Sequence, residues 1–213
     1  MATKRSWFLV AVYEIQSRSK SYSSITWNVL EYLALFLIVM LHEFGHALAC
    51  RQVGGTANRI VLWPLGGVAY VNPPQRPGAT LWSIAAGPLV NVAFLVILWS
   101  LGMLNRTTGW ADAIPNAHPF LRTLWLINLG LLIFNLLPIY PLDGGQIARE
   151  ILLKLHPREG IRASLCLSIV AAAAMAVTGF MQWNHDWLVA LFFGYLAYAS
   201  YITLQAYSGR NPW

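Results

Sequence analysis

Five long apolar stretches constrain the fold of this 213-residue chain more than any other feature. They cover residues 27–50, 80–101, 120–138, 163–181 and 187–206. Each is about as long as the ~20 residues that a helix needs to cross the hydrocarbon core of a bilayer. Only 10% of the residues are charged, whereas soluble domains carry about 25%. The stretches therefore predict an all-α membrane protein.

A sixth apolar segment, residues 6–17, precedes these stretches and is too short for a full span. Counting it as a shortened first helix gives about six transmembrane helices. We expect residues 1–213 to form a single polytopic membrane domain. No internal repeat stands out in the sequence.

Residues 56–72 have a different pattern. Two short runs rich in β-branched and aromatic residues flank Pro64, Leu65, Gly66 and Gly67, which is typical of two strands joined by a tight turn. Strand edges are excluded from lipid unless protein covers them or they line a cavity. We therefore expect a membrane-associated β-hairpin. It is either a plain surface hairpin or an edge to which an extended substrate segment adds by backbone pairing.

The first long stretch contains a His-Glu-x-x-His motif formed by His42, Glu43 and His46. Residues four apart share one face of a helix, so His42 and His46 can hold one metal ion. Glu43 lies beside them and can act on a water molecule. Three ionisable side chains are costly to bury in an apolar helix, which favours a metal site over a chance occurrence of the pattern.

A second informative segment follows the third long stretch and runs from Asn135 to Gly145. Pro138 and Pro141 cannot both continue a regular helix, so the segment predicts a broken helix. Such a break is tolerated at membrane depth where it lines a cavity or is covered by protein. Asp143 is then either a third metal ligand or a cap of the next helix, 146–155, and the spacing leaves both interpretations open.

The basic residues lie between the apolar stretches and form no single patch, so the net charge of +6 does not indicate nucleic-acid binding. With a cytosolic amino terminus and six crossings, ten basic residues face the cytosol: Lys4, Arg5, Arg51, Arg59, Arg76, Arg149, Lys154, Arg158, Arg162 and Arg210. Four face outward: Arg18, Lys20, Arg106 and Arg122. This bias follows the positive-inside rule and predicts cytosolic termini.

The depth of the motif follows from helical rise. His42 is about 15 residues from Trp27, or roughly 22 Å along the axis of a span whose hydrocarbon surroundings are about 30 Å thick. The motif should therefore lie within the bilayer, nearer the cytosolic face.

Four elements, taken together and in chain order, resemble those of the site-2 protease family of intramembrane zinc metalloproteases. They are the His42–His46 motif, Gly66-Gly67 in the hairpin, Ala86-Gly87-Pro88-x-x-Asn91, and Asn135-x-x-Pro138-x-x-x-Leu142-Asp143-Gly144. The resemblance covers about residues 27–160. We expect a minimal family core without a PDZ domain or a cystathionine-synthase-type (CBS) domain.

The resemblance implies hydrolysis of a peptide bond within or near a transmembrane segment of a membrane-protein substrate. It implies one Zn²⁺ per chain, held by His42, His46 and Asp143, with Glu43 as the catalytic residue. Substrate-binding roles follow for Asn135, Asn91, Gly66 and Gly67. The expected setting is a lipid bilayer, in a bacterial plasma membrane. A regulatory membrane partner and a homo-oligomer both stay open.

Two alternative functions remain open. A membrane metal transporter would use the same ligands to carry an ion, but it has no use for Glu43 beside them, and transporters often show internal repeats. An inactive metal-binding relative would keep the fold without cleavage. Neither the substrate nor the cleavage position follows from the sequence.

Overall fold

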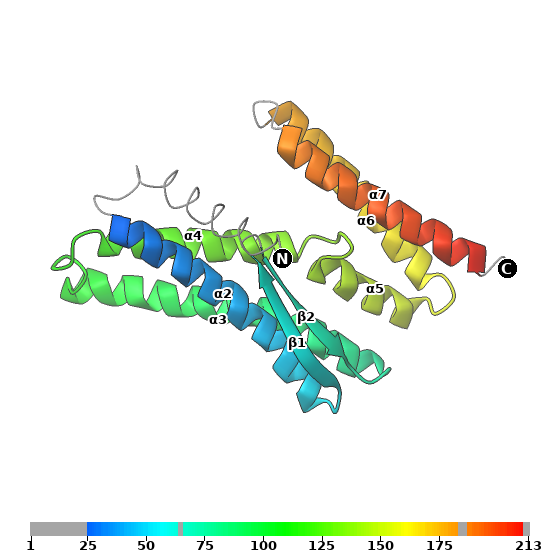
Figure 1. The fold of residues 1–213 in the computed structure, drawn as a ribbon, viewed down its shortest axis with the longest axis horizontal. Helices are drawn as coiled ribbons and strands as arrows, with labels where there is room; N and C mark the ends of the chain where they lie inside the picture. The colour runs from blue at the N-terminus through cyan, green and yellow to red at the C-terminus, as the bar shows by residue number, and fades with distance from the viewer. Residues whose placement is uncertain (1–24, 64–65, 183–186, 211–213) are drawn as a thin grey trace, which may run out of the picture. The chain divides into compact units, whose positions relative to one another are not determined.

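The computed structural model describes residues 25–63, 66–182 and 187–210, which form six helices and one two-stranded sheet (Figure 1). Five of these helices are long and apolar enough to cross a membrane: Ile25–Gln52, Gly78–Thr108, Ala117–Asn135, Gly160–Met181 and Trp187–Ser208. The five long predicted spans are thereby confirmed. The predicted short span 6–17 lies outside the described residues.

Contacts between residues group the chain into two compact units, and each is considered by itself. The N-terminal unit holds the described residues up to Pro74 together with Ala86–Leu132. The C-terminal unit holds Gln75–Ala85 and the described residues from Ile133 onward. Helix α3 (Pro77–Thr108) and helix α4 (Ala117–Asn135) each contribute to both units.

Helix α2 (Ile25–Gln52) ends two residues after the apolar stretch 27–50. Gly54 adopts a φ of 86°, a left-handed conformation that favours glycine, and the Gly55 N–H bonds to the Cys50 carbonyl at 2.9 Å. This is the usual way to satisfy carbonyl groups at the end of a helix. The chain then reverses into the hairpin.

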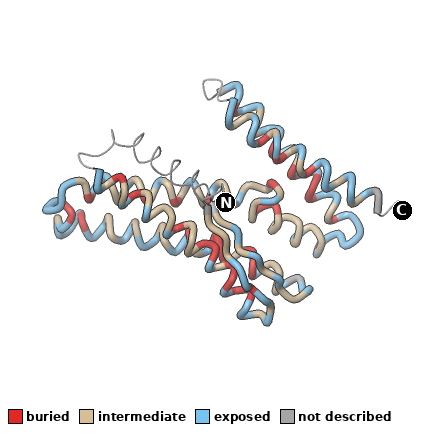
Figure 2. Tube along the Cα trace, in the orientation of Figure 1, coloured by how far each residue is buried: buried red, intermediate tan, exposed pale blue. Residues whose placement is uncertain are grey.

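The predicted hairpin is confirmed as β1 (Thr56–Trp63) and β2 (Gly66–Asn72), paired antiparallel with an irregularity between Ala57 and Arg59. It packs on the C-terminal part of α2, where the tube is coloured as buried (Figure 2). The Arg51 guanidinium donates to the Ala57 carbonyl at 2.6 and 3.1 Å. Ala47, Cys50 and Ala57 form a small apolar cluster beneath the strands. Helix α2 therefore covers one face of the hairpin, while Val68 and Tyr70 of β2 are exposed.

Helix α3 comes very close to α2 because Gly45 has no side chain. A β-carbon at Gly45 would lie 2.8 Å from the Ala86 carbonyl oxygen and 2.8 Å from Val90 Cγ2. Small residues at such crossings let two backbones approach in membrane proteins. This crossing brings the residues after Ala86 alongside the His-Glu-x-x-His motif.

In the C-terminal unit, α4 ends at Asn135 and α5 (Asp143–Leu155) begins after a non-helical segment, so the predicted helix break is confirmed. Helix α5 packs on α6 (Gly160–Gln182), and α6 packs along α7 (Trp187–Arg210) (Figure 1). The side chain of Ile139, inside the break, is fully buried in a cluster with Ala172, Phe193 and Leu196. The break is therefore anchored in the apolar core of its unit.

One of the two interpretations of Asp143 needs correction. Helix α5 begins at Asp143 itself, and its cap position is Leu142, which makes no side-chain cap bond, so Asp143 is not the capping residue. The two cysteines differ in burial. Cys50 is buried, but Cys166 is exposed on α6.

Candidate metal centre

His42 and His46 lie one turn apart on α2 and present their rings to each other. The two Nε2 atoms are 3.1 Å apart, and the rings meet nearly edge to face at 83°. Both residues are buried, with exposed fractions of 5% and 8%. Zinc–nitrogen bonds of about 2.0–2.1 Å in tetrahedral geometry put two ligand nitrogens roughly 3.3 Å apart. The observed separation therefore fits two ligands of one zinc ion.

The other ring nitrogen of His42 is held by a buried chain of amides. His42 Nδ1 is 2.7 Å from Asn91 Oδ1, so Nδ1 carries the proton and donates it to the amide oxygen. That tautomer leaves the Nε2 lone pair for a metal, as hydrogen-bonded histidine ligands do in metal sites. Asn91 in turn donates to Asn128 Oδ1 at 2.9 Å, and Asn128 Nδ2 donates to the Asn91 carbonyl at 2.9 Å.

Asn128, on α4, is a residue that the sequence analysis missed, and Asn91 was assigned a substrate-binding role, which stays a prediction. Asn91 and Asn128 are almost completely buried, at 1% and 0% exposure. A signal for Asn128 exists in the sequence: it is an amide in the middle of an apolar span, where a polar group needs a partner. Which partner it takes depends on how α3 and α4 pack.

Gly87, on α3, leaves open the space beside the two imidazoles. A β-carbon at Gly87 would lie 2.8 Å from His42 Nε2 and would collide with the Nε2 and Cε1 atoms of His46. Pro88 follows inside the same helix, where it removes a backbone hydrogen bond. The space that a methyl group would fill is therefore on the metal-binding side of the rings.

Glu43 projects to the hairpin and is 7% exposed. Its Oε2 accepts a 2.6 Å hydrogen bond from the Ala69 N–H of β2. A β-carbon at Gly67 would come within 2.7 Å of Glu43 Cγ, so the glycine makes room for the carboxylate. Because the Ala69 N–H points to Glu43, it points away from β1, and the outer edge of β2 faces the motif. Gly66 begins β2 and pairs with Trp63.

The remaining predicted site residues belong to the C-terminal unit. Asn135 is the last residue of α4 and Asp143 is the first of α5. Gly144 and Gly145 are buried because the start of α5 packs against the backbone of the preceding segment. A β-carbon at either glycine would collide with carbonyl groups of that segment, from Leu136 to Ile139. This close packing fixes the position of the Asp143 backbone at the start of α5.

Comparison with known proteins identifies the family. A family model described as Peptidase family M50 matches residues 31–117 and 111–178. The chain belongs to this family, the site-2 proteases. The family assignment predicted from the four sequence elements is thus confirmed.

The chain is also similar to individual curated proteins, one of which has zinc in its name. The chain is 37% identical to Zinc metalloprotease MJ0392 of Methanocaldococcus jannaschii over 147 residues, which are 69% of this chain and 41% of that protein. It is 27% identical over 205 residues to Stage IV sporulation protein FB of Bacillus subtilis, covering 88% of this chain and 67% of the relative. The chain thus spans about two fifths of the length of MJ0392.

The fold matches a solved structure, the Site-2 Protease from Methanocaldococcus jannaschii, with a TM-score of 0.63 and 29% sequence identity. The match covers 92% of this chain and 87% of that one. The predicted fold class is therefore confirmed. The paired, buried imidazoles suit zinc, the ion in the name of MJ0392.

Replacing Asn91 by alanine should weaken zinc binding about 10- to 100-fold, because His42 would lose the partner that fixes its tautomer and ring orientation. Competition with a chelator measures the zinc dissociation constant. Thr107→Ala is a matched control on the same helix, since the Thr107 hydroxyl bonds only locally, to the Leu104 carbonyl. An unchanged zinc affinity in Asn91→Ala would show that the amide does not orient His42.

Proposed function

We propose that this chain is an intramembrane zinc endopeptidase that hydrolyses a peptide bond within or near a transmembrane segment of a membrane protein. One observation carries the proposal: His42, Glu43 and His46 lie on a single buried helical turn, and the carboxylate bonds to the outer edge of a β-strand. Metal-binding groups, a base and a strand edge are the parts that peptide hydrolysis needs.

We propose Asp143 as the third zinc ligand. Catalytic zinc sites use three protein ligands and keep one position open, and two histidines with one carboxylate form such a set. Asp143 is the only acidic residue in the first turn of α5, directly after the break in the helix. Its backbone surroundings are tightly packed through Gly144 and Gly145. A rigid support of this kind suits a ligand.

Glu43 is the proposed catalytic residue. It removes a proton from the attacking water and later delivers it to the leaving amine, which are the two tasks of a general base and acid. The Ala69 N–H orients the carboxylate before the substrate arrives. Zinc, when bound, supplies a Lewis acid that polarises the scissile carbonyl and lowers the pKa of water. Asn135 donates a hydrogen bond to the substrate backbone or to the developing oxyanion.

The substrate is proposed to bind as an extended strand. A helical peptide bond is shielded by its own turns, so the target segment must unwind before it reaches Glu43. The outer edge of β2, at Ala69, provides backbone groups for such a segment within reach of the carboxylate. Gly66 and Gly67 begin this edge, and Gly67 keeps it close to Glu43.

The proposed setting is a bacterial plasma membrane with both termini in the cytosol and the site nearer the cytosolic face. The ten-to-four division of basic residues between the two sides supports this orientation. The chain is an integral membrane protein by family and by its apolar helices.

The zinc content of purified full-length protein tests the ligand set. Wild type should bind about one zinc per chain, and His46→Ala and Asp143→Ala should both lose it, because each removes one of three ligands. His118→Ala, an exposed histidine on α4, is the matched control and should keep the metal. Elemental analysis after removal of loosely bound metal gives the measurement.

The same proteins in liposomes test the reaction. Wild type should cleave a single-span test protein whose transmembrane helix is loosened by glycine and proline, and the zinc-free variants should not. Zinc retained in Asp143→Ala would remove that residue from the ligand set. Zinc-loaded wild type that never cuts a loosened segment would contradict the protease assignment.

A further inference from the structure

The Tyr140 backbone, inside the broken helix, is held at both ends by serine hydroxyls from two other helices. The Tyr140 N–H donates to Ser168 Oγ of α6 at 2.7 Å. Ser200 Oγ of α7 donates to the Tyr140 carbonyl at 3.3 Å. The two hydroxyls lie 2.8 Å apart and are bonded to each other. The contacts span 28 and 60 residues of sequence, so no local turn explains them.

These two hydroxyls behave differently from the others in the same helices. Serine and threonine in a membrane helix commonly satisfy their hydroxyls on a carbonyl of the preceding turn. Ser164 does so on Ile161, and Thr203 does so on Ala199. Ser168 and Ser200 instead reach the broken segment, and both are fully buried at 0% exposure.

The fixed backbone of Tyr140 is close in sequence to the proposed zinc ligand. The Ile139 side chain is locked in the apolar core with Ala172 and Phe193. The Leu142 N–H bonds to the Ile139 carbonyl at 2.8 Å, which closes the turn that leads into Asp143. Packing and hydrogen bonds thus hold both sides of the Ile139–Tyr140 step, and only two residues separate Tyr140 from Asp143.

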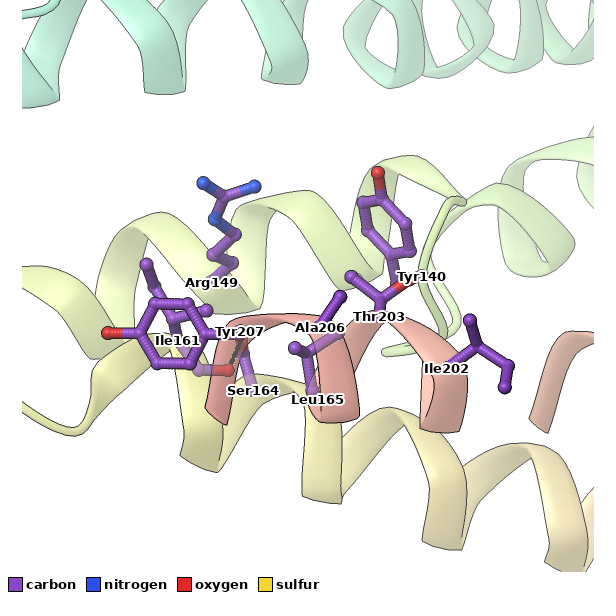
Figure 3. Close-up of a pocket in the computed structure, with 10 residues that line it drawn as sticks. Tyr140, Arg149, Ile161, Ser164, Leu165, Ile202, Thr203, Ala206 and Tyr207 are labelled. Carbon is purple, nitrogen blue, oxygen red and sulfur yellow. Dashed lines mark hydrogen bonds between the residues drawn. The ribbon is translucent and has the colours of Figure 1, made fainter. Parts of the chain in front are cut away.

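The Tyr140 ring takes no part in this arrangement. It lines a cavity of about 410 Å³, together with Arg149, Thr203 and Tyr207 (Figure 3). The hydrogen bonds from the serines to Tyr140 are to its backbone. Their contribution can therefore be removed without altering the ring or the charge of the segment.

We infer that Ser168 and Ser200 are positioning residues that set the place of Asp143 in the zinc site. The inference rests on the proposed function, in which Asp143 is a zinc ligand. The hydroxyl pair fixes the backbone of Tyr140 on both sides of its α-carbon, and the turn transmits that position to the start of α5. Without the hydroxyl pair, the Asp143 carboxylate has more conformational freedom, and zinc binding must then restrict it.

The test compares Ser168→Ala, Ser200→Ala and the double variant in full-length protein, with free zinc as the probe. Each single variant should raise the zinc dissociation constant about 10- to 100-fold, the range seen when a supporting hydrogen bond behind a metal ligand is lost. The double variant should raise the dissociation constant by less than the product of the two single-variant factors, because the hydroxyls bond to each other and act on the backbone of one residue. Ser200→Thr, which keeps a hydroxyl, should restore most of the affinity.

Ser164→Ala is the matched control, since Ser164 lies one turn before Ser168, is buried, and bonds within its own helix. It should leave zinc affinity unchanged. Thermal unfolding without zinc separates the positioning role from a purely structural one. A lower unfolding temperature in the serine variants at wild-type zinc affinity would overturn the inference, as would an equal affinity loss in Ser164→Ala.

Measurements on Asp143→Ala distinguish a failure of the serine positioning role from a failure of the zinc-ligand assignment. If Asp143→Ala loses zinc while the serine variants keep it, only the positioning role fails. If Asp143→Ala keeps zinc at wild-type affinity, the ligand assignment fails and the positioning role fails with it. Serine substitutions added to Asp143→Ala should leave the weak residual zinc affinity unchanged, and a further loss there would contradict action through Asp143.

Discussion

Glu43→Gln should lower the cleavage rate about 10²- to 10⁴-fold, because the variant loses the group that removes and returns a proton. Zinc should remain bound, since the amide has nearly the shape of the carboxylate and leaves His42 and His46 in place. The glutamine oxygen can still accept from the Ala69 N–H, so the hairpin contact should survive. Cleavage of the loosened single-span test protein in liposomes, with zinc content measured on the same samples, checks both expectations.

Glu159→Gln is the control for Glu43→Gln, because Glu159 is exposed between α5 and α6 and is none of the proposed site residues. Its cleavage rate should equal that of wild type. Cleavage rate and zinc content, measured together, also distinguish a protease from a metal transporter and from an inactive relative. Zinc transport across the bilayer that persists in Glu43→Gln would support a transporter, while wild type and Glu43→Gln that are equally inert and equally loaded with zinc would indicate an inactive relative.

The sequence was sufficient for the parts of the site that depend on spacing along one helix. His42, Glu43 and His46 share a turn, so their proximity follows from helical geometry alone. The break before Asp143 was equally predictable, since Pro138 and Pro141 exclude a continuous helix for covalent reasons. The hairpin followed from residue pattern and turn chemistry, and the structure confirms it at 56–63 and 66–72.

Other parts of the site depend on packing between distant elements. Asn128 supports Asn91, and through it His42, only because α3 and α4 lie against each other at that level. The side of the hairpin that faces Glu43 depends on how the hairpin docks on α2, which residue pattern alone does not specify. The membrane adds to this difficulty, because in an apolar environment nearly every position on a helix is apolar, and burial leaves little periodic signal.

The serine pair illustrates the same limit. In the sequence, Ser168 and Ser164 are equivalent hydroxyls in one apolar helix. The structure shows that one reaches the Tyr140 backbone and the other turns back to its own helix. The difference comes from which face of α6 meets the broken segment, a tertiary property.

Gly87→Ala should abolish zinc binding at wild-type affinity and lower cleavage about 100-fold or more. The added methyl group would collide with the His46 ring and lie 2.8 Å from His42 Nε2. The rings cannot retreat easily, because His42 is bonded to buried Asn91 and Gly45 already brings the α2 backbone against α3. A displacement of about 1 Å at a reactive centre is enough for a loss of this size.

Gly102→Ala, on the same helix, supplies the matched control for Gly87→Ala. A β-carbon at Gly102 meets no atom within 4 Å, and alanine favours a helix over glycine by up to about 1 kcal/mol. That variant should keep zinc and activity and should unfold at an equal or higher temperature. If Gly87→Ala binds zinc as well as Gly102→Ala, the ion does not lie between the imidazoles on the Gly87 side. The ligand nitrogens would then have to be the Nδ1 atoms, and Asn91 would compete with the metal for His42 where it now supports it.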